Sequence, residues 1–303
     1  MTERHLEDAT PAKARVALVT CAALPDLDDD DRLLVAPLAR RGLTAEAVVW
    51  DDPAVDWAAY DLVVLRDPWD YVERRDAFVA WAAGVPRLAN PADVVAWNTD
   101  KRYLGELAAA GAPVVPTTWV APGDGWRGPG AGEFVVKPVV GAGSRDSGRY
   151  DASRPADRRL AEAHVRRLAA AGRTAMVQPY LAAVDTHGET ALVFIGGAYS
   201  HAIRKGALLT GPATGDDPLY RPETITPRTP SGAERDVAAR VLAACPFPAD
   251  RLLYARVDLI PGPDGAPVLV ELELTEPSLF LGTADGAADR LADAVAAAVA
   301  VAR

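Results

Sequence analysis

Two apolar runs near the C-terminus are joined by a turn that predicts how they pair. Residues 254–260 read Tyr-Ala-Arg-Val-Asp-Leu-Ile, and residues 268–274 read Val-Leu-Val-Glu-Leu-Glu-Leu. Asp264 and Gly265 lie at the centre of the connection. An Asp-Gly pair between two alternating apolar runs is a strong signal for a β-hairpin. The sequence therefore predicts two antiparallel strands centred on this turn.

The predicted hairpin collects charged side chains on one face. A turn centred between Asp264 and Gly265 pairs Asp258 with Glu271 and Arg256 with Glu273. Because residues two apart on a strand share a face, these four side chains project together, and Arg256 neutralises only part of the negative charge. Clustered carboxylates suit Mg²⁺, which takes one or two of them and leaves its other positions for water and phosphate. A solvent-facing acidic hairpin is the alternative.

Composition narrows the class of protein. The chain has 303 residues, enough for two domains or one elaborate α/β unit. Its net charge of -10 argues against a nucleic-acid partner. Cys21 and Cys245 are too few and too far apart for a disulfide framework or a zinc motif. No apolar run is long enough to span a membrane, and no secretory segment is recognisable, so we expect a cytoplasmic protein with no membrane partner.

Strands and helices alternate over the first ninety residues. We expect a disordered tail at 1–14, strands at 15–21, 45–50, 61–66 and near 87, and helices at 29–41 and 74–83. This alternation predicts a parallel sheet in a small Rossmann-like unit that ends near residue 90. No glycine-rich fingerprint follows the first strand, so a dinucleotide site is not expected.

The rest of the chain mixes strands and helices less regularly. Asn90 is expected to cap a helix that has Pro91 in its first turn, and a second helix is expected from Lys101 to Ala110. Ser231 and Glu234 form a capping-box signal for a helix that ends near 244. We also expect strands at 133–138, 174–178, 189–195 and 198–204, helices at 156–171 and 284–302, and loops at 121–132 and 210–230.

A glycine-rich turn follows one of these strands. Lys137 ends the strand, and Gly141-Ala-Gly-Ser144 comes soon after it. Glycines let backbone N–H groups approach an anion closely, and the lysine adds a positive charge. The motif is not a Walker loop, because the lysine precedes the glycines. An ordinary connection is the alternative.

Two more segments suggest contacts with an anion and a base. Lys101 is expected in the first turn of a helix, where a cation opposes the macrodipole unless an anion offsets it. Pro179 interrupts strand pairing after Gln178 and leaves an extended connector whose backbone groups can face a purine. A solvated lysine and a simple turn are the respective alternatives.

Taken together and in order, these motifs resemble those of the ATP-grasp ligases. The resemblance covers residues 90 to the end, and residues 14–90 resemble the domain that precedes the ATP-grasp fold. Within that superfamily the motifs resemble those of carboxylate–amine ligases, which include glutathione synthetase-like, RimK-like and cycloserine-forming members. The matching motifs are Lys101, Lys137 with Gly141–Ser144, Gln178-Pro179-Tyr180-Leu181, Glu189, Arg204-Lys205, Arg256-Val-Asp258 and Glu271-Leu-Glu273.

The resemblance implies an α/β and α+β architecture: a Rossmann-like domain at 15–90, then a two-subdomain ATP-grasp fold at 91–303 with a small lid at about 117–180. ATP would lie between the subdomains. The residues that would hold its phosphates are Lys101, Lys137, Gly141, Gly143 and Ser144. Those that would hold the adenine are Gln178, Pro179, Tyr180 and Leu181, and Glu189 would hold the ribose.

The metal ligands implied by the resemblance are Asp258 with Glu271 or Glu273, for Mg²⁺ or alternatively Mn²⁺. The family usually has a Glu-x-Asn pair where this chain has Glu271-Leu-Glu273, and Glu276 follows shortly. Which of these three glutamates binds the metal therefore stays open.

The implied reaction forms an amide or related C–N bond through an acyl phosphate on a small amino-acid-like carboxylate. Alternatives are a cycloserine-type ring closure, a kinase-like transfer and an ATP-binding protein without ligase chemistry. The sequence does not define the oligomeric state, for which a homodimer is one alternative. Expected catalytic cations are Arg256, Arg204 and Lys205, and expected substrate contacts are Arg66, Trp69 and Tyr71, which follow a strand of the N-terminal unit. The loop at 210–230 is expected to cover the site.

Overall fold

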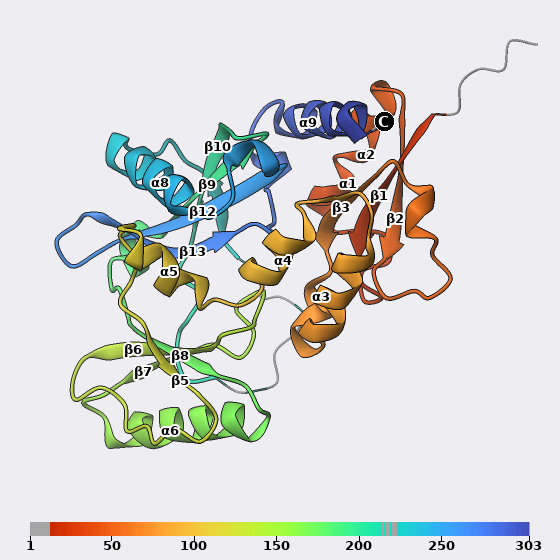
Figure 1. Ribbon diagram of the computed structural model, residues 1–303. Helices are drawn as coiled ribbons and strands as arrows, with labels where there is room; N and C mark the ends of the chain where they lie inside the picture. The colour runs from red at the N-terminus through yellow and green to blue at the C-terminus, as the bar shows by residue number, and fades with distance from the viewer. Residues whose placement is uncertain (1–12, 214, 216–218, 220–222, 303) are drawn as a thin grey trace, which may run out of the picture.

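The N-terminal part of the chain forms a parallel four-stranded sheet (Figure 1). The computed structural model describes residues 13–213, 215, 219 and 223–302; most of the predicted tail, residues 1–12, lies outside them. The strand order is β2-β1-β3-β4. The bounds are β1 Ala14–Thr20, β2 Leu43–Val49, β3 Leu62–Asp67 and β4 Leu88–Ala89. The predicted parallel sheet is therefore confirmed, and it begins at Ala14, inside the predicted tail.

Short helices connect these strands. They are α1 Asp29–Arg32, α2 Val35–Arg40, α3 Arg75–Gly84 and the 3₁₀ segments η1 Trp57–Ala59 and η2 Trp69–Glu73. The prediction of a single helix at 29–41 is wrong, since a turn at Leu33 and Leu34 separates α1 from α2. Pro37 has no N–H to donate to the Leu33 carbonyl, so the helix restarts and places the proline in its first turn.

Two buried asparagines link the next helices to the C-terminal sheet. The helices are α4 Ala92–Asn98 and α5 Tyr103–Ala109. Asn90 does not cap α4 as predicted: its amide donates to the carbonyls of Tyr254 and Leu274 at 2.9 and 2.7 Å. The amide of Asn98 donates to the Leu272 carbonyl at 2.8 Å. Both side chains therefore satisfy backbone groups at strand ends instead of helix starts.

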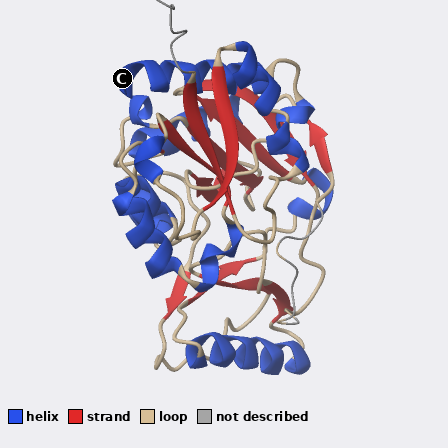
Figure 2. Ribbon diagram, turned by 90° about the vertical axis from the view of Figure 1, so that its right-hand side faces the viewer, coloured by secondary structure: helices blue, strands red, loops and turns tan. Residues whose placement is uncertain are grey.

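A small antiparallel sheet lies apart from the others with one long helix against it (Figure 2). Its strand order is β5-β8-β6-β7. The elements are β5 Thr118–Val120, β6 Glu133–Pro138, β7 Gly148–Asp151, β8 Ala175–Pro179 and α6 Pro155–Ala170. Its core is built from its own residues, including Phe134, Tyr150 and Val165.

The third sheet has five antiparallel strands in the order β11-β10-β9-β12-β13. Its strands are β9 Glu189–Ile195, β10 Ala198–Lys205, β11 Ile225–Pro227, β12 Tyr254–Pro261 and β13 Pro267–Glu273. Helices α7 Val184–His187 and α8 Gly232–Ala244 and the 3₁₀ segment η3 Ala249–Arg251 accompany it. The predicted capping box of Ser231 and Glu234 is present at the start of α8.

The predicted register of the β12–β13 hairpin is confirmed at its charged positions. Arg256 pairs with Glu273, and Asp258 pairs with Glu271. The register then shifts by one residue between Asp258 and Leu259, so the predicted pairing does not continue to the turn. This irregularity leaves the charged residues on one face of the ribbon.

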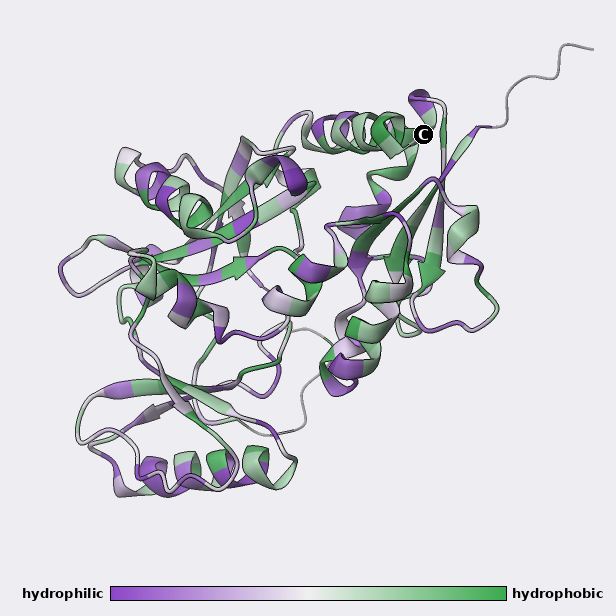
Figure 3. Cartoon of the chain, viewed as in Figure 1, coloured by the Kyte–Doolittle hydropathy of each residue, from purple (hydrophilic) through white to green (hydrophobic). Residues whose placement is uncertain are grey.

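The last helix joins the N-terminal unit to the five-stranded sheet. It is α9 Ala287–Ala302, preceded by the 3₁₀ segment η4 Leu281–Thr283. Its apolar face contributes Leu291 and Val295 to a core that also contains Leu18 of β1 and Val193 of β9 (Figure 3). Polar residues on its other face pair with the N-terminal unit, as Arg41 does with Asp289 at 2.9 Å. None of the described helices is long and apolar enough to cross a membrane.

Candidate active site

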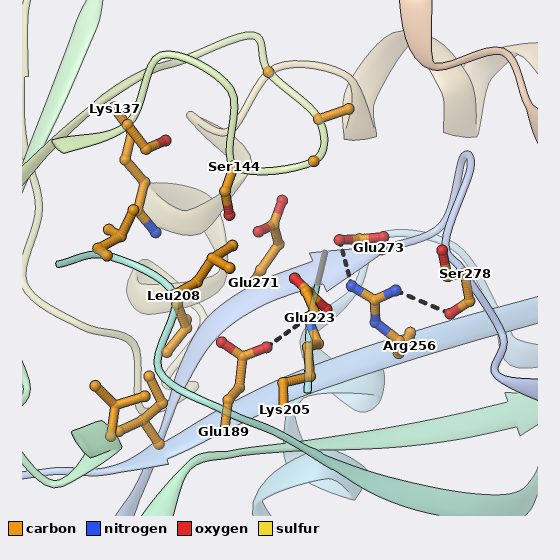
Figure 4. Close-up of a pocket in the computed structure, with 18 of the residues that line it drawn as sticks. Lys137, Ser144, Glu189, Lys205, Leu208, Glu223, Arg256, Glu271, Glu273 and Ser278 are labelled. Atoms are coloured by element: carbon orange, nitrogen blue, oxygen red, sulfur yellow. Dashed lines mark hydrogen bonds and ion pairs between the residues drawn. The ribbon is translucent and has the colours of Figure 1, made fainter. Parts of the chain in front are cut away.

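A cavity of about 400 Å³ lies where the three sheets meet. The N-terminal unit lines it with Asp28, Asp30 and Trp69. The small sheet contributes the end of β6, the loop after it and the end of β8, and the five-stranded sheet contributes β9, β10, β12 and β13 (Figure 4). Residues from widely separated parts of the chain therefore share one space.

Alternating cations and carboxylates line one part of the cavity. Lys101 Nζ lies 3.1 Å from Glu271 Oε1, and Arg256 Nη2 lies 2.6 Å from Glu273 Oε1. Lys205 Nζ lies 2.6 Å from Glu189 Oε1 (Figure 4). The sequence predicted that these carboxylates and lysines come together, and the contact between Lys101 and Glu271 joins the two sets directly.

Asp258 lies beneath these charged side chains and is only 1% exposed. Its carboxylate accepts hydrogen bonds from Lys205 Nζ at 2.7 Å and from Arg256 Nε at 2.9 Å. Burial alone would raise the pKa of Asp258, but the two cations hold it well below its usual range. Asp258 does not line the cavity, and both of its oxygens accept hydrogen bonds, so its role as a metal ligand stays a prediction.

The remaining acidic residues still fit one divalent cation. Within the described part of the chain no three acidic, histidine or cysteine side chains are grouped tightly enough to enclose a metal. Mg²⁺ does not require such a cage, since one or two carboxylates and substrate phosphates suffice. Burial raises the pKa of Glu273 to about 8, and the charges of Glu271 and Asp258 add to the effect. A cation between Glu271 and Glu273 would relieve that repulsion.

Lys137 presents a cation without a counter-ion. It is half-buried at the end of β6, and no described residue lies within hydrogen-bond or ion-pair distance of its Nζ. Burial lowers its pKa, the charges of Glu271 and Glu189 oppose that shift, and those of Lys101 and Lys205 add to it. An anionic ligand would remove this penalty. Lys101 instead donates to the Gly141 carbonyl as well as pairing with Glu271.

The glycine-rich loop between β6 and β7 follows Lys137 along the cavity wall. Gly141, Gly143 and Ser144 line the cavity as predicted for this loop. Gly143 and Ser144 have φ values of 58° and 56°, in the left-handed region that tight turns require. Asp146 ties the loop to the neighbouring helix α6.

The anchor at Asp146 predicts an acid-sensitive contribution to stability. Its carboxylate lies 3.1 Å from His164 Nε2 and also pairs with Arg167 and Arg173. Burial opposes ionisation, yet His164 and the arginines lower the pKa to about 2. Because the folded pKa lies below the unfolded value of about 4, the stabilisation is present above pH 4 and is lost as pH falls toward 2.

We therefore expect Asp146→Asn to lower the free energy of unfolding by up to about 2 kcal/mol at pH 7 and by much less near pH 2. Chemical denaturation of both proteins across this pH range measures the difference. A constant gap between them at every pH would contradict the assignment.

The other part of the cavity is apolar. Its lining residues Val115, Leu181, Val184 and Ile260 belong to one hydrophobic cluster, with Val270 packed against it. The connector predicted to face a base, from Gln178 to Leu181, lies here and lines the cavity throughout. The Gln178 amide donates to Thr117 Oγ1 at 2.9 Å and so is held in place.

Two predicted cations do not reach the cavity. Arg66 is fully buried, bonded to Asp31 at 2.7 Å and to the Pro277 carbonyl at 2.6 Å, so the prediction that it binds a substrate carboxylate is wrong. Arg204 donates to the carbonyls of Thr186 and His187 and does not line the cavity. Strand alternation points Lys205 into the cavity and its neighbour Arg204 to the opposite face.

The two aromatic residues predicted to contact the substrate have different positions. Trp69 lines the cavity, whereas Tyr71 is buried behind it and donates to Glu276 Oε1 at 2.7 Å. Glu276 lines the cavity, and burial raises its pKa to about 7. Tyr71 is therefore a positioning residue and not part of the wall as predicted.

Several lining residues had no motif in the sequence. They are Asp28, Asp30, Glu223, Ser278, Phe280 and Thr283. The acidic run from Asp28 to Asp31 was the one visible signal among them. The predicted covering loop is only partly described: 214, 216–218 and 220–222 lie outside the description, while Glu223 and Ile225 line the cavity.

Comparison with solved structures identifies the fold. The ATP-grasp RimK domain protein from Sphaerobacter thermophilus superposes with a TM-score of 0.62 at 20% identity, covering 92% of this chain and 98% of that one. The D-alanine–D-alanine ligase from Bacillus anthracis, in complex with ATP, gives 0.63 at 14% identity, covering 95% of this chain and 98% of that one. At such identities the likeness concerns the fold alone, and it confirms the predicted architecture. The fold and the site define the ATP-grasp class.

A closer relationship fixes the family. Residues 16–90 match the family described as the N-terminal domain of D-cycloserine synthetase DcsG. The cycloserine biosynthesis protein DcsG of Streptomyces lavendulae is 43% identical over 293 residues, covering 90% of this chain and 95% of that protein. The crystal structure of D-cycloserine synthetase DcsG superposes with a TM-score of 0.83 at 40% identity, covering 94% of this chain and all of that one. The chain belongs to the DcsG family. The prediction of an ATP-dependent C–N bond-forming ligase of ATP-grasp type is thereby confirmed.

Proposed function

We propose that this enzyme uses ATP to close an amino-acid derivative onto its own carboxylate, as a cyclo-ligase of the cycloserine type. The observation that carries the proposal is 43% identity over 95% of a cycloserine biosynthesis protein. The DcsG crystal structure is of a D-cycloserine synthetase, which favours ring closure over the two-substrate amide formation inferred first from the motifs. Two-substrate ligation is the second candidate.

We place the nucleotide according to the two parts of the cavity. The apolar part, with the connector from Gln178 to Leu181, suits the adenine, because it offers an apolar slot beside an extended piece of backbone. Glu189 lies between this part and the cations and is our candidate for the ribose. The uncompensated charge of Lys137 and the loop at 141–144 suit the phosphates.

The metal would lie between the phosphates and strand β13. Glu271 and Glu273 would hold Mg²⁺ or Mn²⁺, which would neutralise phosphate charge when bound. Asp258 would keep Lys205 and Arg256 in place from beneath. Arg256 would thereby remain aimed at the charge that develops on the transferred phosphoryl group.

The reaction would then proceed in two steps. A substrate carboxylate oxygen attacks the terminal phosphorus, the bond to ADP breaks, and an acyl phosphate forms. The amine of the same molecule attacks the acyl carbon, phosphate leaves, and the nitrogen gives up a proton. Closure of the cavity around the bound ligands would protect the acyl phosphate from water.

The chemistry of the ring selects the substrate to test. Opening the ring amide of D-cycloserine with water gives D-serine whose side-chain oxygen carries an amino group, here called O-amino-D-serine. We expect ATP-dependent phosphate release with this compound alone, and a product lighter than it by one water. The L-isomer and plain D-serine serve as controls.

The results of this assay distinguish the candidate reactions. Phosphate release that strictly requires an added second amine would overturn ring closure and favour two-substrate ligation. A stable phosphorylated product would instead indicate a phosphotransferase.

We also propose that the domains follow the three sheets, with residues 15–90 preceding an ATP-grasp region at 91–303 and the small sheet at about 117–180 acting as its lid. A cytoplasmic location, the absence of nucleic-acid and membrane partners, and the choice between monomer and homodimer stay predictions.

A further inference from the structure

The segment after β13 is fixed in place by side chains from elsewhere in the molecule. Tyr254 Oη shares its proton between the carbonyls of Leu65 at 2.8 Å and Thr275 at 3.0 Å. Arg66 Nη2 donates to the Pro277 carbonyl at 2.6 Å. Between them, Trp69 Nε1 donates to the Glu276 carbonyl at 3.1 Å. Three consecutive carbonyls are thus each bound by a different buried side chain. The position of Glu276 is therefore set by the junction of the N-terminal unit with the hairpin.

The side chain of Glu276 has one oxygen fixed and one open. Tyr71 Oη donates to Oε1 at 2.7 Å, and Tyr71 is itself 2% exposed. No described residue donates to Oε2, and no described cation lies within ion-pair distance of either oxygen. In this respect Glu276 differs from Glu271 and Glu273, which each have a cationic partner.

Two other carboxylates on this side of the cavity accept hydrogen bonds from backbone N–H groups. Asp30 accepts hydrogen bonds from the backbone N–H groups of Leu281 and Gly282, both at 2.8 Å. Asp28 caps helix α1 by accepting the N–H of Asp30 at 2.7 Å. Asp28 and Asp30 thus stabilise backbone groups of the fold, whereas the one described donor to the Glu276 carboxylate is the Tyr71 hydroxyl. Glu276 can therefore receive a cationic group of the ligand without giving up a backbone contact.

From this geometry we propose that Glu276 binds the α-ammonium group of the substrate, with Tyr71 holding the carboxylate in position. The inference rests on the proposed function, because the substrate class is an amino acid whose carboxylate is activated. Its α-ammonium is the one cation of that molecule at neutral pH, since an aminooxy nitrogen is weakly basic and stays uncharged. A carboxylate without a cationic partner satisfies that charge, while Arg256 and Lys137 remain for the carboxylate and phosphate groups.

The test compares two substrates in two enzymes. The first substrate is O-amino-D-serine, and the second is 3-aminooxypropionate, the same molecule without its α-amino group. We expect Glu276→Gln to raise the KM for O-amino-D-serine by about 10- to 100-fold, as for the loss of a charge-assisted hydrogen bond. The KM for 3-aminooxypropionate should be high in both enzymes and nearly equal between them.

Additional variants and a binding measurement make the result specific. Tyr71→Phe keeps the ring and removes the hydroxyl, so it should raise the same KM by a smaller factor at unchanged ATP affinity. Glu162→Gln, on the outer helix α6, serves as the matched control. Calorimetric titration with ATP and Mg²⁺ should give the same affinities for wild type and Glu276→Gln.

Each contrary result has a distinct meaning. Equal losses on both substrates would overturn the proposal and point to contact with the nucleophile. A changed Mg²⁺ affinity would overturn it in favour of a metal ligand. If the wild-type enzyme turns over neither compound, the proposed function fails, and this is separate from an effect of Glu276.

Discussion

Replacing Lys137 with alanine is expected to reduce ATP turnover by about 100- to 1,000-fold while leaving the fold intact. The size follows from the loss of one pre-positioned donor to a developing negative charge. Its ammonium has no counter-ion among the described residues, and burial lowers its pKa, so an anionic ligand is the partner that it lacks. Phosphate release at saturating substrate measures the loss, and circular dichroism checks the fold.

Lys13→Ala is the matched control, because Lys13 is an exposed lysine at the start of the first sheet. It should turn over ATP at the wild-type rate. Wild-type turnover by Lys137→Ala would contradict the proposal that Lys137 binds the ATP phosphates. It would also contradict the proposed orientation of the nucleotide in the cavity.

Replacing Asp258 with alanine is expected to lower the free energy of unfolding by about 3 to 5 kcal/mol. Asp258 is buried and receives hydrogen bonds from both Lys205 and Arg256. Its removal leaves these cations close together with less compensation, since among the described residues Glu189 and Glu273 are the carboxylates that remain within ion-pair distance of them. Urea denaturation followed by fluorescence measures the change.

Two further variants test the cause of that loss. Asp258→Asn keeps a hydrogen-bond acceptor and should cost less than the alanine variant. Asp236→Ala, on the exposed face of α8, should leave the unfolding midpoint unchanged. A loss below about 1 kcal/mol for Asp258→Ala, the scale of an exposed pair, would show that the buried charges are not coupled as described.

Local patterns in the sequence predicted much of the site, because that part of it depends on strand alternation. The hairpin turn and the period of two placed Arg256, Asp258, Glu271 and Glu273 on one face, as the structure has them. The same rule separates Lys205 from Arg204, although the two adjacent cations resemble a single motif in the sequence. The pairing of the strands could therefore be predicted from the sequence, while the extent to which each side chain is buried could not.

Burial across domain junctions escaped prediction for a physical reason. Arg66 lies at the carboxyl end of β3, where open α/β sheets commonly place ligand contacts, yet Asp31 and a carbonyl from the segment after β13 enclose it. Those partners are distant in sequence, so no local pattern contains them. The same holds for Tyr71, whose partner Glu276 is more than two hundred residues away.

The helix α9 has a consequence for how ligands reach the cavity. Its apolar face shares one core with both β1 and β9, so we expect the N-terminal unit and the five-stranded sheet to move together. The small sheet has a core made largely of its own residues. We therefore expect the small sheet to move relative to the rest of the molecule during nucleotide exchange, with hinges near residues 117 and 180. Lys137 and the glycine-rich loop would move with it.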